Sequence, residues 1–299
     1  MQTKADLMLL VVALLWGASY LLIDYSLEEL DPFNINAIRF LFAFLVAFMI
    51  AGRRLLPANR ITLQYAALLG FILMVVYLGV TFGVKYTSLS NAGFLCALTV
   101  VITPIFGFLL KKQRPEKKLL IAVLTALTGI ALLTLNEQLR PASGDLLCIL
   151  CAVVYAVHLL VTETAVKKEG VNVFHLGVYQ LGFCGIYQLV LSFLTESPRF
   201  PSSAKVWTSV LVLSVFCTGI SYVVQTIAQQ YTSASHVGVI FSLDPVFAAL
   251  VAFFIAGEIL KVRAYVGAVL LLLSVLIMEV DFKKLLKRKE IPEEPEKLE

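Results

Sequence analysis

Two ionisable side chains lie inside long apolar stretches of this 299-residue chain, where they could handle a proton or a charged ligand. Asp244 stands near the middle of stretch 234–256 and precedes Pro245, whose ring removes a backbone N–H donor. His158 lies in stretch 144–164. A charge at the centre of a bilayer costs about 2.5–3.5 kcal/mol, which makes both residues candidates for function. For Asp244 the alternative is structural, with the protonated carboxyl donating to a carbonyl that Pro245 leaves unbonded.

Aromatic and amide side chains form a second candidate set. Tryptophan normally occupies membrane interfaces, yet Trp16 lies near the centre of stretch 6–26, beside the small residues Gly17, Ala18 and Ser19. Packing as core filling is the alternative for the rings. Pro104 and Pro245 are expected to kink their helices. We expect one mid-membrane binding cavity, lined by Trp16, Ser19, Tyr20, Tyr77, Tyr155, His158, Gln180, Tyr222, Gln225 and Asp244.

Several kinds of chemistry are not expected. Cys148 and Cys151 form a C-x-x-C pair, but no second pair accompanies it, so we expect packing, with no metal, no disulfide and no cofactor. Ser19, His158 and Asp244 include the atom types of a serine hydrolase, yet the Gly-x-Ser-x-Gly context is absent. The sequence also lacks the Gly-x-x-x-x-Gly-Lys-Ser/Thr phosphate loop. We therefore expect neither an enzyme nor an ATP-driven pump.

Ten apolar stretches of about twenty residues account for most of the chain. Hydrophobic residues make up 60% of the composition and charged residues 15%, and the mean hydropathy is +0.90. A helix needs about 20 apolar residues to cross a bilayer. We therefore expect an all-α integral membrane protein with ten transmembrane helices, at about 6–26, 33–51, 62–84, 89–110, 118–135, 144–164, 173–194, 206–227, 234–256 and 262–280.

Lysine and arginine are distributed unevenly over the loops between these stretches. With the N-terminus inside, the inner segments carry seventeen and the outer segments six. This excess predicts cytoplasmic termini in a bacterial cytoplasmic membrane. The net charge of +4 then reflects topology, and we expect no nucleic-acid partner. The first stretch is expected to be a retained helix, and residues 282–299 a cytoplasmic tail.

The chain resembles itself at a shift of about half its length. At a shift of 145 residues Tyr77 aligns with Tyr222, and at 139 residues Trp16 aligns with Tyr155. Chance similarity between apolar segments is the alternative. We expect two five-helix repeats, over residues 1–138 and 139–281. Because five is odd, the second repeat enters the membrane from the other side, and such inverted repeats are typical of carriers that work by alternating access around a midplane site.

The chain resembles the drug/metabolite transporter superfamily, and within it the EamA-type ten-helix carriers. The resemblance covers about residues 6–280 and is carried by Trp16-Gly17, Arg39-Phe40, the turns Tyr86-Thr87-Ser88 and Tyr231-Thr232-Ser233, Asp244-Pro245 and Gly257-Glu258. The first repeat departs from the pattern, with the basic loop 111–115 in place of a Gly-Glu pair. The resemblance implies a transporter that works in the export direction, and its motifs say little about the substrate. Our leading hypothesis is a secondary active carrier of small polar metabolites, such as amino acids or related compounds. Energy would come from an ion gradient, with a proton as the candidate coupling ion.

Three other functions stay open at this point. A multidrug or cationic-compound effluxer would need an acidic cavity, to which Asp244 alone contributes. An intramembrane enzyme would need a nucleophile and a base at depth. A channel would not need an inverted duplication.

The remaining ionisable residues are expected near helix ends. Arg39 is expected to pair with Asp31 or Glu29 at the outer surface. His175 and His236 are expected at the interfaces. Asp24 and Lys85 are placed at the outer ends of their helices, where a charged group reaches water by snorkelling. Glu258 is expected to form a salt bridge with Lys261 or Arg263.

Overall fold

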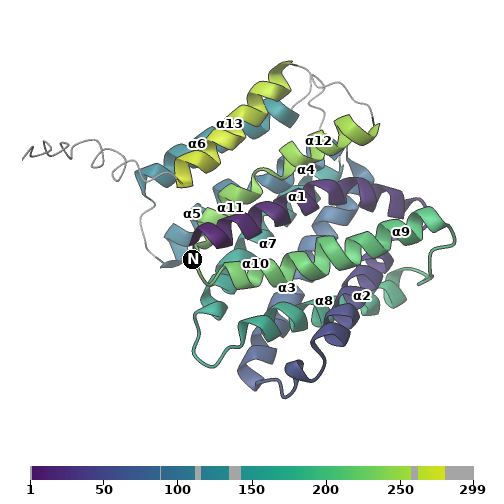
Figure 1. The fold of residues 1–299 in the computed structure, drawn as a ribbon. Coiled ribbons are helices and arrows are strands. Elements are labelled where there is room, and N and C mark those ends of the chain that lie inside the picture. The colour runs from purple at the N-terminus through teal and green to yellow at the C-terminus, as the bar shows by residue number, and fades with distance from the viewer. Residues whose placement is uncertain (1, 88, 112–115, 135–142, 257–261, 280–299) are drawn as a thin grey trace, which may run out of the picture.

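The computed structural model describes residues 2–87, 89–111, 116–134, 143–256 and 262–279. Within these ranges every regular element is helical (Figure 1). Helix is what apolar segments require in a membrane, because a helix satisfies its backbone hydrogen bonds within one segment. The expected all-α class is therefore confirmed for the described part of the chain. The salt bridge expected between Glu258 and Lys261 or Arg263 stays a prediction, because Glu258 and Lys261 lie outside the described residues.

The helices follow one another along the chain with short connections. Their bounds are α1 (Gln2–Leu27), α2 (Pro32–Ala51), η1 (Gly52–Leu55), α3 (Arg60–Tyr86), α4 (Leu89–Ala97), α5 (Thr99–Lys111), α6 (Lys117–Thr134), α7 (Ser143–Val166), α8 (Val173–Thr195), α9 (Ala204–Val212), the π-helix η2 (Leu213–Ile220), α10 (Ser221–Ala228), α11 (Ala234–Phe241), α12 (Asp244–Ala256) and α13 (Val262–Glu279).

Six helical segments of the described chain are long and apolar enough to cross a membrane. They are Gln2–Leu27, Pro32–Leu55, Arg60–Tyr86, Ser143–Val166, Val173–Thr195 and Ala204–Ala228. Shorter apolar helices account for the other predicted stretches, among them Leu95–Leu110, Ala234–Ala248 and Tyr265–Ile277. Helix thus occupies each predicted stretch, while the number of ten crossings and the inverted relation of the repeats stay predictions.

Two predicted helices are interrupted at matching positions. Leu98 separates α4 from α5, and Ser242 and Leu243 separate α11 from α12. Leu98 and Leu243 are aligned at the 145-residue shift. Asp244 is therefore the first residue of α12 and not the middle of a continuous helix. Pro245 follows in the first turn, where a missing N–H costs little, so the expected kink at Pro245 is replaced by a break just before it.

The burial pattern differs from that of a soluble protein, because large apolar side chains cover the outside and polar side chains lie in the interior. Large apolar side chains such as Ile50, Phe193 and Leu124 are exposed on the outside of the bundle, whereas Gln180 and Gln225 are completely buried. An apolar outer surface costs nothing against lipid, and buried amides need partners inside the protein. The pattern is that of a bundle whose solvent is the hydrocarbon core of a bilayer.

Packing brings helices from the two halves of the chain together. The most extensive contacts join α3 to α7 and α8, α2 to α8, and α6 to α13. Helices α6 and α13 lie side by side along one edge of the bundle (Figure 1). Gly17 lets α1 approach α12 closely, because a Cβ added there would lie 2.8 Å from the carbonyl oxygen of Asp244. Small residues permit such backbone contact between helices in membranes.

The predicted partners of Arg39 were wrong. Asp31 pairs instead with Lys85, at 3.6 Å, and Glu29 accepts hydrogen bonds from the backbone N–H groups of Ser202 and Ser203. Arg39 itself is completely buried and donates from Nε to the Thr218 hydroxyl at 2.9 Å. The α2 helix turns this side chain inward, toward η2, and away from the outer surface.

Candidate functional site

A pocket lies between helices of both halves of the chain, and its empty volume of about 670 Å³ includes space open to the surroundings. Seven of the ten residues predicted for the binding cavity line it: Trp16, Ser19, Tyr20, Tyr77, Tyr155, Tyr222 and Asp244. The rest of the lining is mostly apolar or small and includes Gly93, Cys96, Thr99, Cys151 and Phe241, which were not predicted for the cavity. An apolar pocket with a few polar groups is the usual form of a small-molecule site.

The pocket residues of α1 and α3 lie toward one end of those two helices. Its α1 residues run from Trp16 to Ile23, nearer the end of that helix at Leu27 than its start. Its α3 residues, including Tyr77, likewise lie toward the end of α3 at Tyr86. These ends are on the side that the basic-residue bias predicts to be outer.

An aromatic layer closes the other side of the pocket. The Trp16 ring lies 4.7 Å from Phe241, 5.2 Å from Tyr222 and 5.8 Å from Tyr155, measured between ring centroids. Its Nε1 donates to the Cys217 carbonyl oxygen at 2.9 Å. The π-helical turn around Cys217 thus supplies the partner that a buried indole N–H needs.

The other three predicted residues lie behind this layer and do not line the pocket. His158 stacks on Tyr155, and its Nε2 lies 3.2 Å from Oε1 of Gln180. The Gln180 amide donates in turn to Thr226 at 2.9 Å. Gln225 accepts from the Tyr155 hydroxyl at 3.1 Å. These side chains support the aromatic layer from the side away from the pocket. In this conformation they would not contact a ligand in the pocket.

Two tyrosines that the repeat alignment equates also contact each other. The Tyr222 hydroxyl donates to the Tyr77 hydroxyl at 3.0 Å, and both rings line the pocket. Trp16 and Tyr155, equated at the 139-residue shift, are likewise in edge contact. Under a twofold operation only residues near the axis meet their own equivalents, so both pairs lie where such an axis would pass.

Asp244 reaches the pocket from the start of α12. Its Oδ1 is buried and has no hydrogen-bond partner within the described chain. Thr99, its counterpart at the 145-residue shift, begins α5 and lines the same pocket. The two helix breaks therefore both meet the pocket, as the discontinuous helices of some transporter folds meet their ligand sites.

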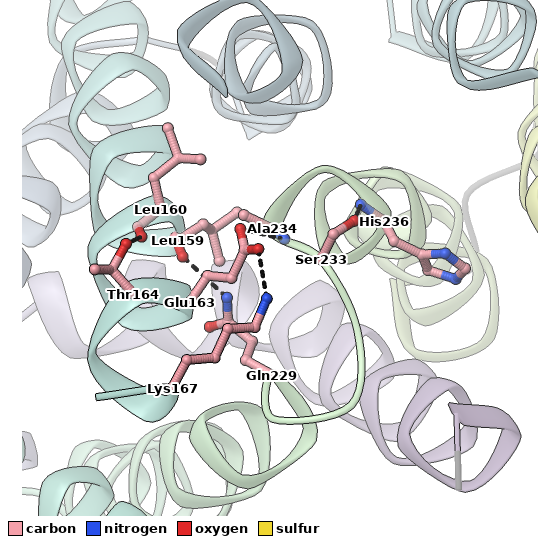
Figure 2. A network of polar contacts seen from close by, with 9 residues as sticks. All are labelled: Leu159, Leu160, Glu163, Thr164, Lys167, Gln229, Ser233, Ala234 and His236. Atoms are coloured by element: carbon pink, nitrogen blue, oxygen red, sulfur yellow. Dashed lines mark hydrogen bonds and ion pairs between the residues drawn. The ribbon is translucent and has the colours of Figure 1, made fainter. Parts of the chain in front are cut away.

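Polar contacts join the helices on the side away from the pocket. Asp6 of α1 lies 3.4 Å from Nε2 of His236 in α11, and both side chains are buried. His236 is buried between α1 and α11, and its expected position at a membrane interface stays a prediction. Figure 2 shows the neighbouring contacts: Glu163 points toward Lys167 and the N–H of Ala234, and the Gln229 amide toward the Leu159 carbonyl. These contacts tie the start of α11 and the end of α10 to α7.

A similar contact lies at the opposite end. The Thr87 hydroxyl donates to Asp145 at 2.5 Å, joining the end of α3 to the start of α7. Asp145 aligns with Asp6 at the 139-residue shift, and Thr87 belongs to the first Tyr-Thr-Ser turn. The alignment could have identified both acids as equivalent, although it could not show their partners.

Arg39 is the buried ionisable residue whose environment the sequence described least well. Its guanidinium carbon lies 4.6 Å from the centroid of the Tyr77 ring, which lines the pocket.

His175, expected at an interface, is largely buried, and its Nε2 lies 2.8 Å from the Arg54 carbonyl oxygen. Its environment is a helix–loop contact remote from the pocket.

The sequence profile of the EamA-like transporter family matches this chain twice, over residues 3–135 and 142–280. The chain belongs to the EamA-like transporter family. A protein from Archaeoglobus fulgidus named "uncharacterized transporter" is 30% identical over 92% of this chain and 86% of its own length. The Bacillus subtilis protein YyaM, with the same description, is 25% identical over 90% of this chain and 92% of its own.

A solved crystal structure supports the fold of this EamA-like chain. It superimposes with a TM-score of 0.78, covering 97% of this chain and all of the other, at 17% sequence identity. The family membership and the apolar helices together make the protein a membrane transporter with a small-molecule substrate. The seven predicted residues in the pocket are candidates for contact with that substrate.

Proposed function

We propose that this EamA-like protein is a secondary active transporter of small polar metabolites, amino acids or related compounds, and that it exports them from the bacterial cytoplasm. The observation that carries the proposal is the pocket between the two halves, which two interrupted helices meet and where Asp244 has an unpartnered Oδ1. A pocket of this composition can hold a molecule with both apolar and charged parts. The sequence lacks a phosphate-loop motif, and we infer that an ion gradient supplies the energy.

Alternating access requires two halves that exchange roles, and the packing supports this. If each helix of residues 1–138 is replaced by its counterpart in 139–281, the contact of α3 with α7 becomes that of α9, η2 and α10 with α1. The contacts of α1 with α11 and α12 likewise become those of α7 with α4 and α5. The pairs α2–α8 and α6–α13 map onto themselves. We infer that the repeats are related by a twofold axis and are inverted.

The position of the pocket suggests which side is closed. It lies in the predicted outer half, and the aromatic layer around Trp16 fills the space beneath it. The Asp6–His236 pair lies beyond that layer, on the predicted cytoplasmic side. We infer that this conformation is closed toward the cytoplasm, and that both termini lie there.

Efflux of organic cations is the second candidate function. Aromatic rings and one carboxylate surround the pocket, a composition that attracts cations. Neutral and zwitterionic metabolites use the same groups, so the two functions differ in the substrates they accept and not in the fold. Both are transport, and neither requires a bond to be broken.

Counterflow in proteoliposomes tests the proposal. Purified protein is reconstituted into vesicles loaded with an unlabelled amino acid mixture, and entry of each labelled amino acid is followed. Saturable entry that depends on the internal pool supports a carrier. In vesicles loaded instead with unlabelled tetraethylammonium, saturable entry of the labelled cation without any amino acid counterflow would favour cation efflux. Entry that neither saturates nor depends on the internal pool would contradict the carrier.

A further inference from the structure

The guanidinium group of Arg39 is charged, and most of its hydrogen-bond donors have no partner among the described residues in this conformation. The side chain is completely buried, and only Nε is bonded, to Thr218. Both terminal nitrogens, Nη1 and Nη2, are buried without a hydrogen-bond partner in the part of the chain that is described, and no acidic residue there pairs with the guanidinium. An arginine stays charged in proteins, so burial without an anion is costly.

The neighbours of Arg39 compensate only part of that cost. The guanidinium carbon lies 4.6 Å from the centroid of the Tyr77 ring and 5.6 Å from that of Phe40. Cation–π contacts contribute about 0.5–2 kcal/mol, which is small beside the desolvation of a full charge. A structural role alone would be served as well by an apolar side chain of similar volume.

Tyr77 stands between Arg39 and the pocket. Its ring lies against the guanidinium and also lines the pocket, and its hydroxyl is bonded to Tyr222. Arg39 is seven residues into α2 and Tyr77 nine residues before the end of α3, and both ends lie on the same side, joined by the Asp31–Lys85 pair. At 1.5 Å per residue both groups lie about 10–14 Å from that surface, at the depth of the pocket.

We infer that Arg39 binds the carboxylate of the transported metabolite, in a state of the carrier in which the Tyr77 ring turns away from the guanidinium. This inference rests on the proposed transport function. The planar fork of arginine matches a carboxylate with two parallel hydrogen bonds, and Nη1 and Nη2 are the atoms left to make them. An inorganic anion such as chloride offers the same charge without the two-point geometry.

The opposite charge of such a substrate also finds a group in the pocket. Asp244 comes from the second half of the chain and has an unpartnered Oδ1, while Arg39 comes from the first half. A zwitterion with a carboxylate and an ammonium group could engage both, and would thereby contact both halves at once. A ligand that bridges the halves can favour one arrangement of them over the other.

Thermal-shift binding with matched ligand pairs tests the inference. Full-length protein in detergent is melted with each protein amino acid and, separately, with its carboxamide, which lacks the carboxylate. We expect at least one free acid to stabilise the wild type more than its amide does. We expect Arg39→Gln to weaken binding of that acid about 10- to 100-fold and to abolish the preference, and Arg39→Lys to retain part of it. Arg199→Gln, at an exposed arginine, is the control and should bind as the wild type does.

Several outcomes would overturn the inference. One is a folded Arg39→Gln protein that keeps the preference for the acid, and another is the absence of any such preference in the wild type, which needs no variant to measure. Stabilisation by chloride, lost in Arg39→Gln and unaccompanied by an acid preference, would assign the site to an inorganic anion. Counterflow of a compound without a carboxylate, equal in wild type and Arg39→Gln, would leave the carrier intact and remove Arg39 from recognition.

Discussion

Asp244 combines a polar group in need of a partner with a position at a helix break. Its Oδ1 is buried and unpartnered, and α12 begins at this residue. An acid in this position can take up a proton when the pocket is empty and release it when a ligand arrives. Our hypothesis is therefore that substrate transport is coupled to the binding and release of one proton at the Asp244 carboxyl group.

Replacing Asp244 by Asn tests the coupling. The amide mimics the protonated acid permanently, so the variant should fold and still exchange substrate across the membrane. It should lose the accumulation of substrate that the proton gradient drives. Transport rates of wild type and Asp244→Asn are compared over a range of pH in proteoliposomes. Asp24→Asn, at an exposed acid near the end of α1, is the control and should behave as the wild type does. Unchanged pH dependence in Asp244→Asn would return this residue to a structural role.

The contact of α1 with α12 depends on one position without a side chain. A Cβ at Gly17 would lie 2.5 Å from Cβ of Phe247 and 2.8 Å from the Ala248 backbone nitrogen. Since the backbone of α12 cannot yield as a flexible side chain can, an added methyl group must push the two helices apart.

We expect Gly17→Ala to lower the free energy of unfolding by about 1–3 kcal/mol, the usual cost of overpacking. Gly107→Ala is the matched control, because its Cβ would meet only the end of the Leu160 side chain, at 3.9 Å. That control should be neutral or slightly stabilising, since alanine favours helix. Melting in detergent compares the two, and equal stability of both variants would contradict the close contact.

The Glu29 carboxylate ties the loop after α1 to the residues at the start of α9. Hydrogen bonds from Ser203 and Ser202 hold the pKa of Glu29 at about 2, below its ordinary value of 4.5. A carboxyl group with a lowered pKa stabilises the folded state above its ordinary pKa, and this contribution is lost as the pH falls toward the folded value.

We therefore expect Glu29→Gln to melt below the wild type at neutral pH, by an amount that stays constant down to about pH 5 and then shrinks toward about pH 2. The measurement is the difference in melting temperature between the two proteins at each pH. Glu169→Gln, at an exposed residue of the loop between α7 and α8, should show no such convergence. A difference that does not change with pH would exclude the ionic contribution.

At the scale of the molecule, the two ends of the pathway carry equivalent acids with different partners. Asp6 lies against His236 at one end, and Asp145 accepts from Thr87 at the other. A carrier that alternates must separate each pair in turn. Covalent links across either pair should therefore stop transport.

Disulfide trapping tests this in a background without the native cysteines. Paired cysteines at Asp6 and His236, or at Thr87 and Asp145, should reduce transport to background after oxidation and restore it after reduction. A pair at Ser202 and Glu29, where α1 and α9 are already tied, shows whether links at the surface matter in general. A crosslinked protein that transports at the full rate would contradict the rocking model.

The orientation in the membrane can be measured with one exposed residue. Ser197 lies on the connection between α8 and α9, which the basic-residue bias places outside. It suits a cysteine reporter better than Ser202, whose hydroxyl donates to Glu29. Ser197→Cys in a background without the native cysteines should react with an impermeant maleimide added to whole cells. Reaction only after the cells are opened would reverse the topology.

The sequence by itself determined the helical class, the apolar stretches and seven of the residues that line the pocket. Membrane helices are specified by local composition, because each satisfies its own hydrogen bonds and must be apolar toward lipid. Trp16 and Tyr77 could be picked out because a polar aromatic residue at mid-helix departs from that composition. The self-similarity indicated which residues are equivalent, and the two matches to the family profile follow the same division.

Only the tertiary structure decided where each polar side chain points and what it meets. Hydropathy placed Arg39 near a helix end and gave it surface partners, but rotation of α2 about its axis turned it inward beside Tyr77. It also placed Asp244 within one helix, whereas two residues without α-helical structure precede it. The rotation of a helix and the position of a break depend on packing between segments that are distant in the sequence, such as Gly17 against α12. The composition of each segment alone cannot predict that packing.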